Sequence, residues 1–437
     1  RAHNDDISNL KVPYIEMKAR FSIPLTLVLG LCLALSFELG SVSPSLLTGL
    51  EAVYAQDSDM KFWVFDGHMH PTSSRRRGNI GDPNPNYRFT LPKAFEGGLG
   101  AGFFNSGVDE FYETNRLAVK EVLRQFDRFY HQIGLYPDQI GVARSAQEVR
   151  ALRRENKIAA VLAIEGAVAI ESDLGVLRML HRLGLREMNL VHNLENNIGD
   201  VMHSSRNGGK GYGLTEYGRE LVAEMNRLGI LIDLSHTAEQ TVLDVMEVST
   251  QTVVTTHSGV RALASSPTIP SWSDEMIRKL AQMQGVICVP FLPMVVNQEF
   301  QDKWHRGRSR GSGVMGLEPL VYRGDPTKIY EFIAERRARR DSGRAEMTRQ
   351  RQKDIPPLSD LIDSIDYIVR LVGADYVGIS SDWGGYPVNI KGIENAGEYQ
   401  NIAQALLRRG YSREDVAKVM GENLLRVFDE VASTASH

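Results

Sequence analysis

The chain has 437 residues, of which 42% are hydrophobic, 24% charged and 8% aromatic. This composition supports a large buried core and excludes intrinsic disorder, a collagen-like repeat and a small disulfide-stapled fold. Lys and Arg number 50 against 54 Asp and Glu, a formal net charge of −4. A chain so close to neutrality has no overall field that attracts polyanions, so nucleic acid is not an expected partner.

The first 55 residues have the features of an export leader. Lys18 and Arg20 precede an apolar run, Phe21–Phe37, and Val53–Ala55 offers small residues at the spacing that signal peptidase reads before Gln56. We expect cleavage there and export to the periplasm or the extracellular space. The alternative is an uncleaved membrane anchor, because a span needs about 20 apolar residues and the run is nearly that long.

Short apolar, β-branched runs alternate with amphipathic stretches of helical period along the rest of the chain. Eight of the runs are predicted strands: Phe62–Asp66, Ala101–Phe104, Ala159–Ile164, Glu187–Val191, Ile230–Leu234, Thr252–Thr256, Val286–Pro290 and Tyr376–Ser380. Parallel strands need crossover helices, so this α/β alternation predicts a closed barrel or a doubly wound sheet. The number eight favours a TIM (β/α)8 barrel, and we expect residues 56–437 to form one such domain.

Capping residues predict two helix boundaries. The stretch Thr215–Leu228 carries leucine, valine and methionine on one face and charge on the other, and Gly229 ends it. After the fifth predicted strand, Thr237 and Gln240 have the spacing of a capping box, which predicts that a helix begins there.

One charged segment, residues 297–354, interrupts the alternation before the last predicted strand. It contains 14 Lys or Arg and nine Asp or Glu, including the cluster Arg336, Arg337, Arg339 and Arg340. We interpret it as a solvated helical insertion in a barrel loop. The alternative is a basic arm that binds an acidic partner.

Metal-competent side chains stand where the predicted strands end. They are His68, His70, Glu165, His192, His236, His257 and Asp382. The carboxyl ends of barrel strands meet at one rim, so these side chains are expected to converge. Any one of them alone could be a hydrogen-bonded core or loop residue, but five of the ten histidines after residue 55 share this register. Cys288, the only thiol after residue 55, is not at the rim, and we expect a buried small hydrophobe.

The histidines and one carboxylate can hold a pair of metal ions. His68 and His70 lie on the same side of a strand, so both imidazoles can bind one cation at about 2.0–2.1 Å. His236 and His257 on adjacent strands can hold a second. Glu165 can give one oxygen to each ion, as in sites whose metals are about 3.5–4 Å apart. Nitrogen and carboxylate ligands fit Zn²⁺ best, with Mn²⁺, Fe²⁺ and Co²⁺ as alternatives.

Seven stretches carry a family resemblance: Asp66–His68, Ile164–Gly166, Asn189–Asn193, Gly213–His236, Thr256–Ser258, Gly378–Asp382 and Gly421–Phe428. In this order they resemble the membrane dipeptidase (renal dipeptidase-like) family of binuclear zinc peptidases, in the amidohydrolase superfamily. The match extends from about Phe62 to Phe428, and its most specific part is the long stretch that ends at His236. The resemblance implies a TIM barrel and hydrolysis of the amide bond of a dipeptide or a related compound.

The resemblance also implies roles by position. It assigns two ligand sets that share one carboxylate, namely His68, His70 and Glu165, and Glu165, His236 and His257. It places His192 on the oxyanion and makes Asp382 the acid and base beside a hydroxide that bridges the metals. The alternatives are a structural role for His192 and direct metal ligation by Asp382.

Two positions depart from the family pattern. The family has His-x-Asp where this chain has His68-x-His70, and the neutral imidazole raises the charge of the site by one unit, which is expected to weaken that metal's binding. The family's arginine that binds the substrate carboxylate, eleven residues past the sixth-strand histidine, is Thr268 here. Arg261 is a candidate substitute, with a salt bridge at the rim as the alternative. Free-carboxylate dipeptides are therefore not assured as substrates.

Three functions stay open at this stage. The first is an exported binuclear metallohydrolase that cleaves dipeptides or dipeptide-like compounds. The second, motivated by His70 and Thr268, is an amidohydrolase that acts on N-acyl amino acids or lactones. The third is a metal-bearing binding protein without catalysis. The expected partner is a small-molecule substrate, contact with a membrane is expected only through an uncleaved leader, and the oligomeric state, a homodimer included, stays open.

Overall fold

The computed structural model describes residues 61–73, 78–108, 112, 116–193, 196–202, 204, 210–265, 271–305, 328–335, 338 and 352–434. The predicted leader lies outside the described residues, as do Thr268 and the arginine cluster that begins at Arg336. None of the helices in the described part combines the length and the apolar character that a bilayer span requires.

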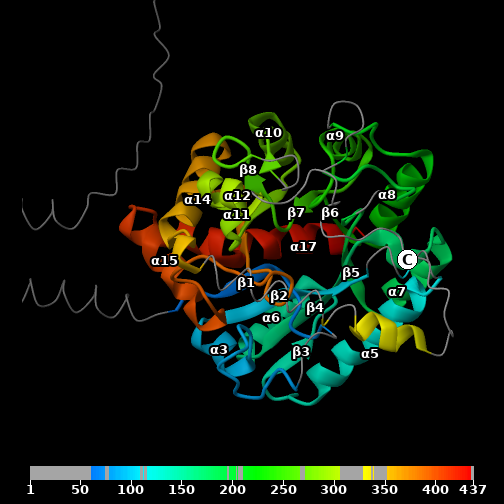
Figure 1. The fold of residues 1–437 in the computed structure, drawn as a ribbon, viewed down its shortest axis with the longest axis horizontal. Helices are drawn as coiled ribbons and strands as arrows, with labels where there is room; N and C mark the ends of the chain where they lie inside the picture. Colours follow the sequence, from blue (N-terminus) through cyan, green and yellow to red (C-terminus); the bar gives the residue numbers. More distant parts are fainter. Residues whose placement is uncertain are drawn as a thin grey trace, which may run out of the picture. The chain divides into compact units, whose positions relative to one another are not determined.

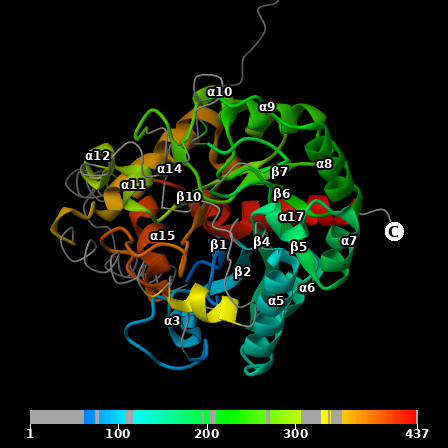
Figure 2. The same cartoon turned by 45° about the vertical axis from the view of Figure 1, so that its right-hand side comes forward.

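Eight parallel strands form the centre of the fold, in the order β1-β2-β4-β5-β6-β7-β10-β11 (Figures 1 and 2). Their bounds are Val64–Met69 (β1), Leu99–Gly107 (β2), Ile158–Glu165 (β4), Leu185–Asn189 (β5), Leu231–Asp233 (β6), Val253–Thr255 (β7), Val286–Pro290 (β10) and Val377–Ser380 (β11). The chain after β11 returns to β1, because the Asp382 N–H donates to the His68 carbonyl at 2.8 Å and the His70 N–H donates to the Trp383 carbonyl at 2.7 Å. The predicted barrel and all eight predicted strands are confirmed.

Helices surround the strands (Figure 2). Their bounds are Leu91–Glu96 (α3), Ala118–Gly134 (α5), Ala146–Arg154 (α6), Leu174–Arg182 (α7), Glu216–Leu228 (α8), Glu239–Val248 (α9), Asp274–Gln282 (α10), Pro293–Val296 (α11), Gln298–His305 (α12), Leu358–Val372 (α14), Tyr399–Arg408 (α15), Arg413–Ala417 (α16) and Asn423–Ser433 (α17). Three short strands were not predicted: Ile140–Val142 (β3), which pairs with the start of β4, and Gly259–Val260 (β8) and Ser271–Trp272 (β9), which pair with each other.

The two capping predictions have different outcomes. Thr215 caps α8 by accepting a hydrogen bond from the Gly218 N–H, and Gly229 ends the helix in the left-handed region with φ 68°, as predicted. The capping box at Thr237 is wrong, because α9 begins one residue later and its N-cap, Ala238, offers no side-chain acceptor. The Thr237 hydroxyl instead donates to the Ser235 carbonyl at 3.2 Å, within the loop that follows β6.

The charged segment is helical where the structure describes it. Helix α12 lies at its start, and residues 328–335 are also helical. In this second stretch Ile329 and Ile333 are buried, and the Tyr330 ring lies 4.1 Å from the Arg124 guanidinium of α5. The described part of the insertion therefore packs on the outer layer of the barrel.

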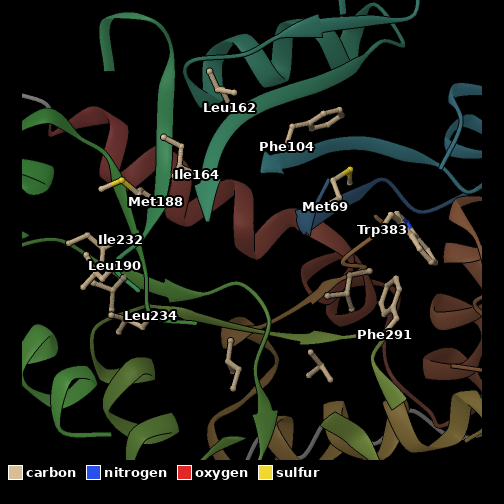
Figure 3. Packing of buried hydrophobic residues seen from close by; sticks show 14 of the residues in the cluster. Met69, Phe104, Leu162, Ile164, Met188, Leu190, Ile232, Leu234, Phe291 and Trp383 are labelled. Atoms are coloured by element: carbon tan, nitrogen blue, oxygen red, sulfur yellow. The ribbon is translucent and has the colours of Figure 1, made fainter. Parts of the chain in front are cut away.

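Alternate strand residues face two different cores. Outward side chains pack under the surrounding helices, among them Met69, Phe104, Leu162, Ile164, Met188 and Ile232 (Figure 3). Inward side chains of the strands pack on α17, which crosses behind the strands in Figure 1, so this helix plugs the amino end of the barrel. Gly421 permits the close approach, because a Cβ there would lie 2.5 Å from the Phe65 backbone nitrogen. Cys288 belongs to this inner core and is buried and unpaired, as expected.

Candidate metal centre

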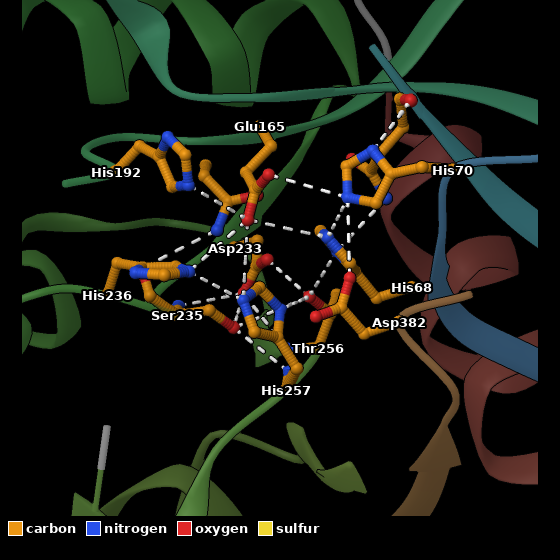
Figure 4. A network of polar contacts seen from close by, with 12 residues as sticks. His68, His70, Glu165, His192, Asp233, Ser235, His236, Thr256, His257 and Asp382 are labelled. Carbon is orange, nitrogen blue, oxygen red and sulfur yellow. Dashed lines mark hydrogen bonds and ion pairs between the residues drawn. The ribbon is translucent and has the colours of Figure 1, made fainter. Parts of the chain in front are cut away.

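The carboxyl ends of six strands bring the predicted metal-competent side chains together. His68 lies in β1, which His70 follows directly, and β4 ends on Glu165. The others stand two or three residues beyond β5, β6, β7 and β11; they are His192, His236, His257 and Asp382. Figure 4 shows Glu165 between His192 and His236 on one side and His68 and His70 on the other.

Glu165 is the common contact of the histidines. Its Oε1 lies 3.2 Å from Nε2 of His236, 3.5 Å from Nε2 of His68 and of His192, and 3.6 Å from Nε2 of His257, and its Oε2 lies 3.4 Å from Nε2 of His70. Burial alone would raise the pKa of the Glu165 carboxyl. The facing imidazoles, His192 first, outweigh it and hold the pKa well below its usual range. The side chain is therefore a buried carboxylate anion.

The spacing of the nitrogen and oxygen atoms fits metal ions. The Nε2 atoms of His68 and His70 are 3.1 Å apart, and those of His236 and His257 are 2.7 Å apart. In a tetrahedral site with metal–ligand distances of about 2.0–2.1 Å, neighbouring ligand atoms lie about 3.3 Å apart. Two sets have all their ligand atoms within 4.8 Å of one another: His68, His70 and Glu165, and Glu165, His236 and His257. Each set can hold one cation, and the two sets share Glu165.

A third set, His68, Asp233 and His257, also meets this distance criterion. The Asp233 oxygens already have partners, however. Oδ1 accepts from the backbone N–H groups of Ser235 and Thr256, both at 2.9 Å, and Oδ2 accepts from the Thr256 hydroxyl at 2.5 Å. Asp233 therefore joins the ends of β6 and β7, the strands that lead to His236 and His257.

Asp66 performs the same task at the seam of the barrel. Its Oδ1 accepts from the backbone N–H groups of His68 at 3.0 Å and Ser381 at 2.9 Å, and its Oδ2 accepts from the Tyr399 hydroxyl. No role was expected for Asp66 or Asp233 from the sequence. A usable signal exists, because Asp66 lies within β1 and Asp233 ends β6, and each bonds the N–H two residues later, the pattern of an Asx turn.

The Nδ1 atoms of the second pair have different surroundings. The His257 Nδ1 lies 3.0 Å from the Thr256 hydroxyl oxygen. That hydroxyl donates a hydrogen bond to the Asp233 carboxylate. The His236 Nδ1 is buried and has no hydrogen-bond partner among the described residues. A hydrogen bond at Nδ1 fixes the orientation of an imidazole ring and leaves its Nε2 to bind a metal. His257 therefore has this support and His236 lacks it.

His192 and Asp382 are more exposed than His68. Their side chains are 18% and 12% exposed, whereas His68 is fully buried. Burial lowers the pKa of His192 to about 3, so its imidazole is neutral at neutral pH. The Asp382 Oδ1 lies 3.6 Å from the His70 Nε2. Asp382 can therefore act beside the first ligand set or bind the same cation.

Two residues of the site have a strained backbone. Asp382 has φ 54° and His236 has φ 65°, in the left-handed region that side-chain-bearing residues rarely adopt. Such a conformation costs on the order of 1–3 kcal/mol and persists where surrounding contacts hold it. The seam bond from the Asp382 N–H to the His68 carbonyl and the bond from the Met202 N–H to the His236 carbonyl, at 2.7 Å, supply that support.

Arg261 and Arg88 differ in their partners. Arg261 forms an ion pair with Glu239, Nη1 to Oε2 at 2.6 Å, which is the rim salt bridge that we gave as the alternative to substrate binding. Arg88 is half-buried and donates to the carbonyls of Tyr386, at 2.7 Å, and Pro387. Burial lowers the pKa of Arg88, and the nearby Asp382 charge opposes that change. Arg88 was not among the residues predicted from the sequence.

A near-closed parallel barrel whose rim holds buried histidines around one carboxylate defines a metal-dependent hydrolase. The model of the family "Membrane dipeptidase (Peptidase family M19)" matches residues 55–437. The chain belongs to this family, and it is a metallo-dipeptidase by class.

Three relatives illustrate the match. Dipeptidase tcpJ from Claviceps purpurea (strain 20.1) is 27% identical over 353 residues, which cover 79% of this chain and 70% of that protein. The crystal structure of the probable dipeptidase PvdM from Pseudomonas aeruginosa has a TM-score of 0.70 at 27% identity, over 87% of this chain and 98% of that one. A metallopeptidase from Rhodobacter sphaeroides, liganded with a phosphinate mimic of the dipeptide L-Ala-D-Ala, shares the fold with a TM-score of 0.67 at 22% identity, over 85% and 100% of the two chains.

Proposed function

We propose that this protein hydrolyses the amide bond of dipeptides with two divalent metal ions, most suitably Zn²⁺. The ligands are His68, His70, Glu165, His236 and His257. The observation that carries the proposal is the position of Glu165, a buried carboxylate whose two oxygens face histidine Nε2 atoms from both sides. The nitrogen and carboxylate ligands, without a thiolate, support Zn²⁺.

When bound, a pair of divalent cations supplies Lewis acidity and lowers the pKa of water. The chain's own residues supply the proton transfers and the charge stabilisation. Asp382 takes a proton from the attacking water and delivers it to the departing amine nitrogen. His192, neutral because burial lowers its pKa to about 3, donates an N–H to the carbonyl oxygen as negative charge develops there.

The substrate that we propose is a dipeptide or a dipeptide-like amide. The names of the relatives support this, and so does the dipeptide mimic bound to the Rhodobacter sphaeroides enzyme. Arg261 binds a substrate carboxylate only if it exchanges Glu239 for that carboxylate, because its guanidinium is already paired.

A hydrolysis assay on Zn²⁺-loaded protein tests the proposal, with dipeptides, N-acyl amino acids and lactones as substrates. We expect dipeptide cleavage, and a fall of about 10²–10⁴-fold in kcat for Asp382→Asn. The control is the metal content of the variant, because retained metal separates an acid–base role from ligation. Turnover of N-acyl amino acids or lactones without dipeptide cleavage would contradict the proposal, and absence of any hydrolysis would favour a binding protein.

We also propose that residues 1–55 are an export leader and that residues 56–437 form one barrel domain outside the cytoplasm. The support is the basic start, the apolar run Phe21–Phe37 and the small residues before Gln56. N-terminal sequencing of the protein recovered from the periplasm or the medium tests this. The expected first residue is Gln56, and recovery of the intact leader in the membrane fraction would contradict it.

A further inference from the structure

Asn105 contacts both histidines of the first ligand set. It lies in β2 and is 2% exposed. Its side-chain Nδ2 lies 3.0 Å from the His68 Nδ1, and its backbone carbonyl lies 3.1 Å from the His70 Nδ1. One residue of the neighbouring strand therefore reaches the far side of both imidazoles, opposite the Nε2 atoms that face Glu165.

The contact between Asn105 and His70 already places a hydrogen-bond acceptor at His70 Nδ1, as metal binding at Nε2 requires. The Nε2 atoms of His68 and His70 point at each other and at Glu165, so both must be free of protons to bind a cation. Each ring proton then sits on Nδ1 and needs an acceptor. The Asn105 carbonyl is that acceptor for His70.

The His68 contact has the required polarity only after an amide rotation. With Nδ2 toward His68, two donors would face each other, while the Asn105 Oδ1 is buried and has no partner among the described residues. The oxygen and nitrogen of an asparagine amide are distinguished by their hydrogen bonds alone. Rotating the amide places Oδ1 on the His68 Nδ1–H, where the Thr256 hydroxyl at 3.3 Å is a second acceptor, and gives up a long contact, 3.4 Å, from Nδ2 to the Phe103 carbonyl.

We propose that Asn105 is a positioning residue for the first metal pocket. Its Oδ1 accepts from His68 and its carbonyl accepts from His70, so both rings are held as the Nδ1–H tautomer with Nε2 toward the cation. This rests on the proposed function, because it requires a metal at His68, His70 and Glu165. Asn105 acts through the two histidines and does not touch the substrate.

Chelator competition on the Zn²⁺-loaded full chain tests the role with two substitutions. Asn105→Leu removes the side-chain acceptor and is expected to weaken the binding of one metal ion by about 10–100-fold. Asn105→Asp keeps an oxygen at the position and is expected to restore binding to the wild-type level or above. A residue that only fills space would give the opposite order, because Asp buries a charge and Leu does not. Unchanged affinity in Asn105→Leu, or weaker binding in Asn105→Asp than in Asn105→Leu, overturns the inference.

Asn423→Leu is the matched control. Asn423 is also buried, 4% exposed, but lies at the amino end of the barrel, where it donates to the Ala374 and Val377 carbonyls. We expect it to lower thermal stability and leave metal affinity unchanged.

Histidine ¹⁵N chemical shifts of the Zn²⁺-loaded wild-type protein give a second readout that does not depend on any variant folding. The expected result is a protonated Nδ1 on His68, and a protonated Nε2 overturns the inference. A wild-type chain that binds no metal overturns the proposed function together with this inference. A wild-type chain that binds metal with an unaffected Asn105→Leu overturns only the inference.

Discussion

The two ends of the barrel use the same strands for opposite purposes. At the amino end, Phe65 and Phe103 pack with ring centroids 5.0 Å apart, and Phe103 packs on Phe428 of α17 at 6.0 Å. Three residues further along β1, His68 meets the carboxylate of Glu165. Apolar burial at the amino end stabilises the fold. Burial at the carboxyl end holds ionisable groups in states that cost stability and favour cation binding.

A substitution at the carboxyl end of the barrel, Glu165→Gln, is expected to reduce activity most. Glu165→Gln replaces the shared carboxylate by an amide, and several kcal/mol of charge stabilisation are lost with the metal, so we expect kcat/KM to fall at least about 10³-fold. Steady-state dipeptide hydrolysis and metal analysis on the same preparation measure this. Glu187→Gln is the matched control, because Glu187 is buried in β5 and its carboxyl oxygens have no hydrogen-bond partner among the described residues. Equal activity of Glu165→Gln and wild type would contradict a bridging role.

The second prediction concerns the amino end of the barrel, where loss of a buried ring is expected to lower the free energy of unfolding. Phe428 is 1% exposed, and Phe428→Ala removes a ring from the plug, which is expected to cost about 3–5 kcal/mol of unfolding free energy. Urea denaturation measures the loss. Metal affinity of the folded variant is expected to stay at the wild-type value, since the substitution lies in the apolar layer. Loss of metal with unchanged stability would show that the two ends are not independent.

The third prediction concerns the pH dependence of stability that the buried Glu187 causes. Both of its carboxyl oxygens are buried without partners among the described residues, and burial raises the pKa of Glu187 well above 4.5. The native chain therefore keeps a proton that the unfolded chain releases above pH 4.5, and the free energy of unfolding falls as the pH rises. We expect Glu187→Gln to match wild type near pH 4.5 and to gain about 1.4 kcal/mol per pH unit above it while the native carboxyl stays protonated.

Denaturation midpoints of wild type and Glu187→Gln between pH 4.5 and 8 check this prediction. A stability difference that stays constant with pH would mean that the native carboxyl is ionised.

The smallest change in stability is expected at Glu224, on a helix outside both ends of the barrel. Glu224 of α8 accepts from Arg227 at 2.8 Å and from Arg178 of α7 at 3.0 Å, and these hydrogen bonds, Arg227 first, lower its pKa to about 2. These two ion pairs of Glu224 stabilise the fold above pH 4.5, and their contribution is lost as the pH falls from 4.5 toward 2. Screening by solvent limits it, so Glu224→Gln is expected to lower stability by less than about 1 kcal/mol at pH 7.

Thermal melts at pH 7 in low and high salt measure the Glu224→Gln effect. The difference from wild type is expected to shrink in high salt, and a larger difference there would contradict an ionic origin.

Local pattern was enough to predict the strands and the convergence of the histidines. The shared side of His68 and His70 follows from the period of a strand, and the rim position of Glu165 follows from the end of β4. Long-range pairs could not be predicted in this way. The bond from Asn105 to His68 depends on the register of β1 against β2, which no local pattern encodes.

The same limit explains the other differences. Asp66 bonds Ser381 across more than 300 positions, and Arg261 pairs with Glu239 of the preceding helix. The capping error at Thr237 is local, because the turn after β6 extends one residue further than the spacing indicates before α9 begins. The predictions for Thr268 and for the leader lie outside the described residues.

Anomalous diffraction from crystals of Zn²⁺-loaded protein, recorded at the zinc absorption edge, is the most direct test of a metal pair that shares Glu165. Two peaks are expected beside Glu165, one within ligand distance of His68 and His70 and the other within ligand distance of His236 and His257. A single peak, or peaks that do not touch Glu165, would contradict it.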